Sequence, residues 1–412
     1  MGCQTWPTRG CFLTLVPSHP AAAKTCTLKL VDALAATKEI LLIGIKLLEK
    51  HLIILGIRGV PAAHGGFESF AERLAPWMVE RGWQVTIYCQ GSATGRRYED
   101  TWQGCRRVHV PIRAQGALGT IEFDVKSTID AMRQNAVLLT LGYNTGFLSA
   151  YVRVRKRRNI INMDGVEWRR AKYNKIQKAY LWINERLAAA SGNVLIADHP
   201  EIARHHASHV RSDKIRMIPY GGEAVCSADK DLLSRFDVEI DSFFTVIARP
   251  EPENSLFEIV RSFSRKRRNA RLVVLGEYAI GNAYQAKVLS AASDEVIFPG
   301  AIYDQKLLHA FRLHSRAYIH GHQVGGTNPS LVEALGAGNA VIAHDNAFNR
   351  WVAGNAGCYF TNEDECETQI ESLLHDGVAI HEMRNEARQR WSENFTWERV
   401  LTDYHYLLES AL

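Results

Sequence analysis

The sequence lacks the features that mark a membrane-spanning or disulfide-bonded protein. In the first fifty residues the longest apolar stretch, residues 40–45, is far shorter than the roughly 20 residues that a membrane-spanning helix needs. No small-residue cleavage site follows it, which argues against a secretory signal peptide. The eight cysteines include no CxxC pair, and the chain is too long for a disulfide scaffold. We therefore expect reduced thiols in a cytoplasmic protein.

The N-terminal extension, residues 1–50, precedes any recognisable domain pattern. Its segment KEILLIGIKLLEK, residues 38–50, has two interpretations. It forms a short amphipathic helix that touches a membrane, or it lies upstream of the true start of the protein. We favour the second interpretation, because the domain pattern begins at Leu52 and a complete fold needs nothing before it.

Length and composition indicate a globular protein of two domains. The 412 residues exceed what one hydrophobic core usually covers, and 46% hydrophobic and 23% charged residues are ordinary values. The net charge of +5 is mild, but basic residues cluster at residues 153–158, 169–178 and 265–268. Two interpretations stay open, a solvated helix face and attraction to an anionic membrane or a phosphate-bearing acceptor. No recognised nucleic-acid-binding module accompanies the charge, which argues against nucleic acid as a partner.

The first half of the chain has the pattern of a Rossmann-like domain. LIILGI, residues 52–57, is the continuous apolar run of a buried parallel strand. A glycine-containing loop follows, and then a helix in which Phe67, Phe70 and Leu74 share one apolar face. This order opens a doubly wound α/β domain. The later strands are predicted at residues 85–89, 108–112, 137–141, 160–163 and 194–197.

The alternation restarts after a polar stretch at residues 226–241. We therefore predict an α/β fold in which two Rossmann-like doubly wound domains, residues 51–225 and 226–396, face a central cleft. The final helix, residues 397–412, is expected to pack back across the first domain. Strands of the second domain are predicted at residues 243–248, 271–276, 295–300, 316–321 and 340–343.

The segment GGTNPSLVEALGAGNAVIAHD, residues 325–345, carries the strongest functional signal. Asn328 is a favoured helix N-cap, and Pro329 suits the first helical position. Residues 325–327 should therefore lie at a helix N-terminus, where free amide groups and the helix dipole attract phosphate. Glu333, one turn further in, is placed to accept hydrogen bonds from sugar hydroxyls. The segment predicts a nucleotide-sugar site rather than an ordinary glycine loop.

Two further groups of residues in the first half should face the cleft. His64, Gly65 and Gly66 allow close backbone approach at a helix start, with a structural turn as the alternative. Asp164 follows a predicted strand, where its carboxylate is placed to bind hydroxyls or to assist a proton transfer. The alternative for Asp164 is a turn-forming Asp-Gly pair.

In the second half, ARPEPEN at residues 248–254 directly follows a predicted strand. Arg249 is suited to neutralising a diphosphate leaving group. Glu253 and Asn254 either contact the ligand or cap the next helix.

The histidines divide into two groups. His205, His206 and His209 have helical spacing that would suit a metal, but no carboxylate or cysteine arrangement completes a site in the sequence. We therefore favour a surface helix and predict no metal. His320 and His322 directly precede the predicted phosphate loop, and ligand contact and a role in the core are equally open for them.

Together these residues resemble a GT-B glycosyltransferase of the large retaining family 4, and more narrowly its bacterial polysaccharide branch that includes rhamnosyltransferases. The resemblance implies a nucleotide diphosphate sugar held mainly by the second domain, with the acceptor entering from the first. It implies catalytic roles for Arg249, on the diphosphate, and for Glu333, on the nucleotide ribose. Asp164 is the third candidate catalytic residue, because of its position after a predicted strand. The resemblance extends from about Leu52 to the C-terminus and is carried by RGVPAAHGGFESFAERL (residues 58–74), NMDGVEW (162–168), IPYGG (218–222), ARPEPEN (248–254) and HGHQVGGTNPSLVEALGAG (320–338). The full set of candidate substrate-binding residues is His64, Gly65, Gly66, Glu253, Asn254, His320, His322, Gly325, Gly326, Thr327 and Asn328.

The sequence departs from the family pattern at three positions. Gly325 stands where the family often has a first glutamate, eight residues before Glu333. The basic lysine that usually follows the arginine is replaced within PEN. Asp164 stands where many members carry a histidine. We interpret these departures as features of the narrower branch.

The resemblance implies retaining transfer without a covalent enzyme intermediate. Helix N-termini and Arg249, rather than a metal, would stabilise the leaving diphosphate, so no metal and no cofactor are expected. The implied sugar is rhamnose or another hexose, with dTDP-rhamnose as the favoured donor. The implied acceptor is a saccharide or a lipid-linked saccharide for cell-surface polysaccharide, at the inner face of the plasma membrane. Two alternatives stay open: a nucleotide-sugar epimerase or phosphorylase on the same fold, and a catalytically silent sugar-binding protein.

Overall fold

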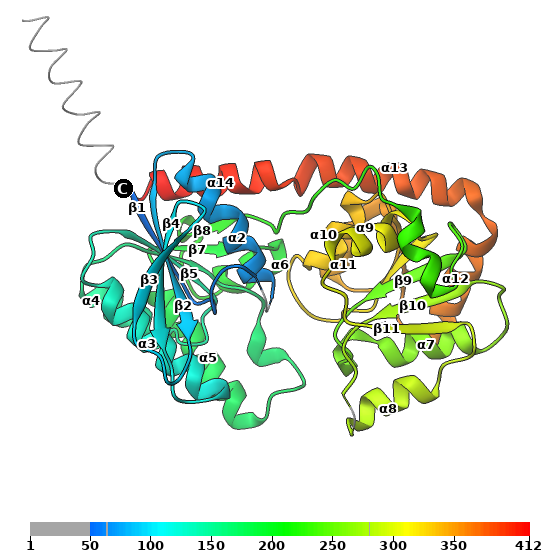
Figure 1. Cartoon of the computed structure of the whole chain (residues 1–412), viewed down its shortest axis with the longest axis horizontal. Helices are drawn as coiled ribbons and strands as arrows, with labels where there is room; N and C mark the ends of the chain where they lie inside the picture. The colour runs from blue at the N-terminus through cyan, green and yellow to red at the C-terminus, as the bar shows by residue number, and fades with distance from the viewer. Residues whose placement is uncertain (1–49, 63–64, 280) are drawn as a thin grey trace, which may run out of the picture. The chain divides into compact units, whose positions relative to one another are not determined.

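The structure is a computed structural model that describes residues 50–62, 65–279 and 281–412. The expectations for the N-terminal extension and for His64 therefore lie outside the described residues. His51–Leu412 form one compact unit, with one parallel-stranded sheet in each half (Figure 1).

An eight-stranded sheet forms the centre of the first half, in the order β3-β4-β2-β1-β5-β6-β7-β8. Only β3 runs antiparallel to its neighbour. The central strands β1 and β5 are mostly apolar and buried, as expected of parallel strands covered on both faces. The strands are β1 His51–Leu55, β2 Gln84–Gly91, β3 Tyr98–Trp102, β4 Cys105–Pro111, β5 Val137–Leu141, β6 Asn159–Asn162, β7 Val194–Ala197 and β8 Ile215–Met217. The helices are α2 Gly66–Val79, α3 Gly116–Ala131, α4 Phe147–Val154, α5 Lys175–Ser191 and α6 Pro200–Ala207.

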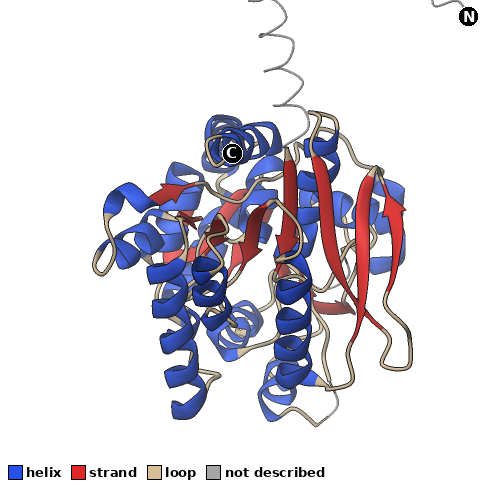
Figure 2. Cartoon of the chain, turned by 90° about the vertical axis from the view of Figure 1, so that its left-hand side faces the viewer, coloured by secondary structure: helices blue, strands red, loops and turns tan. Residues whose placement is uncertain are grey.

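A six-stranded, fully parallel sheet forms the centre of the second half, in the order β11-β10-β9-β12-β13-β14. In the first half, which faces the viewer in Figure 2, helices likewise pack against the strands. The strands are β9 Phe243–Ile247, β10 Arg271–Leu275, β11 Val296–Gly300, β12 Ala317–His320, β13 Ala340–His344 and β14 Gly357–Phe360. The helices are α7 Leu256–Ser264, α8 Ala283–Ser290, α9 Gln305–His314, α10 Pro329–Gly336, α11 Ala347–Ala353, α12 Glu363–His375, α13 Gly377–Asn394 and α14 Trp397–Glu409. The predicted α/β fold with two Rossmann-like domains is confirmed.

The last helix completes the core of the first half. The ring of Tyr404 in α14 lies 4.5 Å from the ring of Phe70 in α2, measured between centroids. The Tyr404 hydroxyl also accepts a hydrogen bond of 2.8 Å from the side chain of Asn162, the last residue of β6. The C-terminal helix therefore supports the strand end that precedes Asp164.

The strand order of each sheet reverses at one place, between β1 and β5 in the first half and between β9 and β12 in the second. Loops that leave the carboxyl ends of strands at such a reversal diverge and leave a crevice, where ligands bind in open α/β sheets. Arg249 follows β9, and the predicted phosphate loop follows β12. Among the described residues, no helix combines the length and the apolar character that crossing a membrane requires.

Candidate functional site

The predicted phosphate loop is built as its sequence indicates. Helix α10 begins at Pro329, and the side chain of its N-cap residue Asn328 accepts a hydrogen bond of 3.0 Å from the amide of Ser330. Gly325 has a φ of 152°, which residues with a side chain rarely adopt. The start of α10 therefore turns its free amide groups toward the first half of the chain.

A carboxylate from the first half occupies this helix start. Asp198 follows β7, and its Oδ2 accepts a hydrogen bond of 2.9 Å from the Thr327 amide. A Cβ on Gly326 would lie 2.2 Å from Oδ1 of Asp198, so only glycine allows this approach. The loop thus already holds one anion, as expected where amide groups meet the positive end of a helix dipole.

Asp164 lies beside this contact, at the end of the neighbouring strand β6. Its φ of 52° is left-handed, a conformation that aspartate tolerates better than most residues. Its amide donates a hydrogen bond of 3.0 Å to the side chain of Asn162, which Tyr404 holds in turn. The backbone is therefore fixed on both sides of the Asp164 carboxylate.

Both carboxylates hold protons more tightly than ordinary aspartates do. Burial and the charge of Glu167 raise the pKa of Asp164 above its ordinary value. Burial and the charge of Asp164 raise the pKa of Asp198 to about 7. The first-half wall of the site therefore exchanges protons near neutral pH, a property that is common at functional sites.

A cavity of about 260 Å³ brings both halves of the chain together. Across from Asp164, its second-half wall contains Arg249, whose guanidinium has no ion-pair partner among the described residues. His322 lies in the same wall, and burial with the charge of Arg249 lowers its pKa to about 3, so its ring is neutral. The predicted residues that line the cavity are Gly66, Asp164, Arg249, His322, Gly325, Gly326, Thr327 and Asn328.

Glu333 lines a second, larger cavity of about 580 Å³. Its carboxylate forms an ion pair with Arg312 of α9, a residue that is only 3% exposed. Tyr220 lines both cavities, which therefore lie side by side along α10. An elongated ligand with its anionic part at the start of α10 would extend toward Glu333.

Three other predicted residues, Glu253, Asn254 and His320, lie behind the cavity wall. Glu253 accepts a hydrogen bond of 2.8 Å from Arg170 of the first half, which makes an ion pair between the halves. The side chain of Asn254 donates a hydrogen bond of 2.8 Å to the backbone carbonyl of Arg249. The N-cap residue of α7 is Ser255, so the interpretation of Glu253 or Asn254 as helix caps is wrong.

His320 is 1% exposed, and its ring stacks on that of His322 at a centroid distance of 4.3 Å. Gly65 is the N-cap residue of α2, and its carbonyl accepts the Ser69 amide at 3.1 Å. The direct ligand contacts assigned to Glu253, Asn254, His320 and Gly65 stay predictions.

The sequence analysis missed Asp198, Arg170 and Tyr220. Asp198 carries the signal that singled out Asp164, a carboxylate directly after an apolar strand of the first half. Arg170 was visible only as one member of a basic segment. Tyr220 lies in IPYGG, where nothing in the spacing predicts a wall between two cavities.

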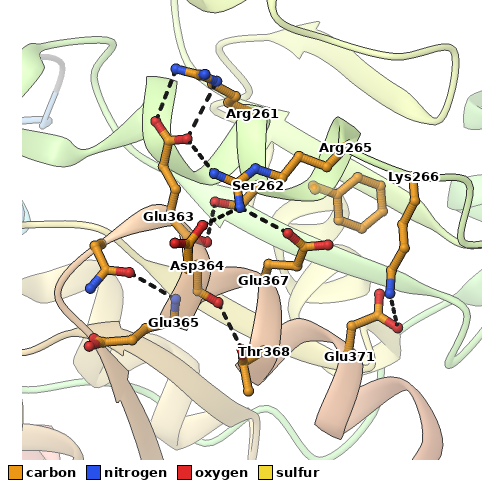
Figure 3. Close-up of polar contacts among 12 residues, drawn as sticks. Arg261, Ser262, Arg265, Lys266, Glu363, Asp364, Glu365, Glu367, Thr368 and Glu371 are labelled. Atoms are coloured by element: carbon orange, nitrogen blue, oxygen red, sulfur yellow. Dashed lines mark hydrogen bonds and ion pairs between the residues drawn. The ribbon is translucent and has the colours of Figure 1, made fainter.

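Three of the four residues of the basic segment 265–268 form ion pairs within the protein. Figure 3 shows that Arg265 pairs with acidic residues of α12, and the Arg265–Glu363 contact measures 2.9 Å. Lys266 and Arg268 pair with Glu371 of the same helix. Residues 265–268 are therefore ill-suited to attract an anionic membrane, whereas residues 153–158 are mostly exposed.

The interpretation of residues 205–209 as a surface helix is also wrong. His206 is 1% exposed, and its group of histidines packs around the fully buried carboxylate of Glu185 in α5. Glu185 supplies the carboxylate that the sequence spacing did not reveal, because it lies twenty positions away on another helix.

Comparison with family models divides the chain at the same place as the two sheets. Residues 49–223 match a model described as Domain of unknown function (DUF1972), and residues 235–394 match one described as Glycosyl transferases group 1. The second half carries a glycosyltransferase domain. No curated protein matches the sequence.

Solved structures with the GT-B fold resemble the chain over most of its length. Sucrose-phosphate synthase from Thermosynechococcus elongatus is 14% identical and matches with a TM-score of 0.75, covering 88% of this chain and 98% of its own. HepE from Anabaena, solved with UDP and glucose, is 14% identical with a TM-score of 0.69, covering 88% and 100%. An α,α-trehalose-phosphate synthase from Burkholderia xenovorans, solved with glucose-6-phosphate, is 11% identical with a TM-score of 0.65, covering 87% and 100%. At these identities the likeness shows the fold.

We expect the contribution of Asp198 to the free energy of unfolding of the unliganded protein to fall as the pH rises from about 4 to about 7. The ordinary pKa of aspartate is about 3.9, and that of Asp198 in the folded protein is about 7. In this window the folded protein keeps a proton that the unfolded chain has released, so a rising pH favours unfolding. Asp198→Asn should remove about 1–2 kcal/mol of this loss, since one unit of pKa shift corresponds to about 1.4 kcal/mol and partial exposure screens part of it.

Urea denaturation at a series of pH values measures the effect. Asp294→Asn, which removes an exposed carboxylate, is the matched control and should retain the wild-type slope. If the curves of Asp198→Asn and the wild type run parallel, Asp198 does not titrate in this window.

Proposed function

We propose that the protein is a retaining glycosyltransferase that binds a nucleotide diphosphate sugar in the cleft and transfers the sugar to a saccharide or lipid-linked acceptor. The observation that carries the proposal is the anion already held at the start of α10, where the Thr327 amide donates to the Asp198 carboxylate at 2.9 Å. A phosphate oxygen fits the same donor, because phosphate and carboxylate are both favoured at helix N-termini. The solved complex of HepE with UDP and glucose supports a nucleotide sugar as the ligand class.

The donor would extend along α10 across both cavities. Its diphosphate takes the place of the Asp198 carboxylate. There it recruits Arg249, which lies in the second-half wall of the cavity and has no ion-pair partner among the described residues. Its nucleoside occupies the larger cavity, where Glu333 accepts hydrogen bonds from the ribose hydroxyls. The buried Arg312 holds the Glu333 carboxylate in place. We favour dTDP-rhamnose as the donor on the resemblance of the sequence alone.

The proposed reaction needs little besides electrostatics. The bond between the sugar and the diphosphate breaks while the acceptor hydroxyl attacks the same face of the sugar and passes its proton to the departing diphosphate oxygen. Arg249 and the amides of the α10 N-terminus stabilise the charge that develops on the diphosphate, in place of a metal. Asp164 accepts a hydrogen bond from a hydroxyl in the 260 Å³ cavity. Contact between the two halves excludes water and so limits hydrolysis of the donor.

Glu333→Gln should weaken donor binding by about 10- to 100-fold, because a hydrogen bond to a charged group contributes about 1.5–3 kcal/mol. The measurement is a thermal-shift screen of nucleotide sugars, followed by calorimetry with the best ligand. Glu386→Gln, on an exposed position of α13, is the control and should bind like the wild type. The unliganded melting temperature of Glu333→Gln shows whether the variant is folded. Wild-type affinity in a folded Glu333→Gln would rule out the ribose assignment.

A surface suited to an anionic membrane supports the lipid-linked acceptor. On α5, Ile176 and Ile183 are 82% and 50% exposed and lie seven positions apart, on one face of the helix. On the adjacent α4, Val154 is 78% exposed and lies within the basic segment 153–158. Exposed apolar side chains beside lysine and arginine are typical of proteins that bind a membrane interface.

Replacing Arg155, Lys156, Arg157 and Arg158 with serine should reduce co-sedimentation with phosphatidylglycerol vesicles. Each basic residue near an anionic surface contributes about 1 kcal/mol, and salt screens the attraction. The matched control replaces four exposed cations of the second half with serine: Lys230, Arg235, Arg267 and Lys306. Wild type and control should bind at low salt and release at high salt. Equal binding to neutral and anionic vesicles, or none to either, would leave this surface as a solvated helix face.

A further inference from the structure

Three histidines and one glutamate converge outside the cleft. Glu185 lies in α5, His205 and His206 lie in the last turn of α6, and His209 follows that helix. One ligand atom from each of the four side chains lies within 4.8 Å of all the others. Four nitrogen and oxygen ligands of this kind are a frequent coordination set for zinc.

The three imidazole rings surround a common point. Their centroids are 5.1, 5.3 and 5.4 Å apart, and each pair of rings is inclined by 66°. Nε2 of His205 lies 2.9 Å from Oε1 of Glu185, and Nε2 of His209 lies 3.7 Å from the same oxygen. Two of the three rings thus face the same carboxylate oxygen, and the third packs beside them.

Two polar atoms of the group lack a hydrogen-bond partner. Nδ1 of His206 and Nε2 of His209 are buried and unpartnered among the described residues. Glu185 is 0% exposed and His206 is 1% exposed, so these side chains are closed off from bulk solvent. A buried polar atom without a partner costs about 1–3 kcal/mol, and a metal ion would satisfy both.

The surroundings of Glu185 match those of a metal-binding carboxylate. Its second oxygen accepts a hydrogen bond of 2.6 Å from the indole of Trp168, the outer contact that commonly orients a ligand. Arg186 lies 3.8 Å from Oε1 and offsets part of the charge of the carboxylate when no ion is bound.

We propose that Glu185, His205, His206 and His209 form a structural zinc site. Four protein ligands would close a tetrahedral coordination shell, which is typical of structural rather than catalytic zinc. The ion would tie α5 to α6 and, through Trp168, to the loop that carries Asp164. The ion takes no part in the reaction proposed for the cleft, so the zinc site and the proposed function can be tested independently.

A path to the site is open from solvent. A surface hollow of about 550 Å³ is lined by His209 and its neighbours, including Ser208 and Arg211. The side chain of His209 is 14% exposed at this edge. Rotation of His209 therefore admits the ion. The ligand atoms, which lie within 4.8 Å of one another, then move toward the separation of roughly 3.4 Å that tetrahedral zinc–nitrogen bonds of about 2.0–2.1 Å require.

The test uses the full-length protein after removal of metal by a chelator and dialysis. Zn²⁺ is titrated against a chromophoric chelator, and Co²⁺ is added separately because tetrahedral Co²⁺ absorbs visible light strongly. We expect stoichiometric Zn²⁺ binding, a tetrahedral Co²⁺ spectrum and a higher melting temperature with Zn²⁺. His206→Gln, Glu185→Gln and His209→Gln should each weaken Zn²⁺ binding by at least about tenfold, the lower end of what loss of an outer contact alone costs.

His381→Gln, which removes an exposed histidine of α13, is the matched control and should bind Zn²⁺ like the wild type. His209 lies at the edge of the site, so His209→Gln decides the question if the more buried variants fail to fold. The proposal is overturned if the wild type shows no tetrahedral Co²⁺ spectrum, or if folded His209→Gln binds Zn²⁺ as tightly as His381→Gln. In either case the group is an ion-pair cluster that supports Trp168 without a metal.

Discussion

The free amide groups at the start of α10 are the constraint on which the site depends. They need an acceptor, and in the unliganded protein it is the Asp198 carboxylate of the other half. A carboxylate at a helix N-terminus contributes about 0.3–1 kcal/mol, enough to favour this contact without making it hard to displace. The Arg170–Glu253 ion pair is a second contact between the halves. Both contacts lie beside the 260 Å³ cavity, so ligand binding there and the approach of the two halves are physically linked.

The two walls of the cavity differ in charge. This difference determines where the diphosphate and the sugar of the proposed donor would bind. The first-half wall carries Asp164 and Asp198, which follow adjacent strands and both have raised pKa values. The second-half wall carries the unpaired Arg249, the neutral His322 and the α10 N-terminus. A diphosphate is repelled by the first wall and attracted by the second, whereas sugar hydroxyls donate readily to the first. The proposed direction of transfer, from the second half toward an acceptor on the first, follows from this asymmetry.

The sequence predicted the fold well wherever strands are buried on both faces. The apolar runs at β5 Val137–Leu141 and β7 Val194–Ala197 were placed to the residue. It missed β3 Tyr98–Trp102, whose residues YEDTW are polar and lie at a sheet edge, and the short β8 Ile215–Met217. The α10 start was predictable because Asn328-Pro329 is a local capping signal. Two carboxylates were not predictable: Asp198, which bonds to that helix start, and Glu185, which lies among the histidines. Tertiary packing brings both there from distant positions in the sequence.

The central claim is that the start of α10 exchanges the Asp198 carboxylate for the diphosphate of a nucleotide sugar. A crystal structure of the protein with a bound nucleoside diphosphate, UDP or dTDP, tests it most directly. The account predicts a terminal phosphate within hydrogen-bonding distance of the Gly326 and Thr327 amides, Arg249 turned toward the diphosphate, and Asp198 displaced from Thr327. A diphosphate bound elsewhere, with the Asp198–Thr327 hydrogen bond intact, would contradict it.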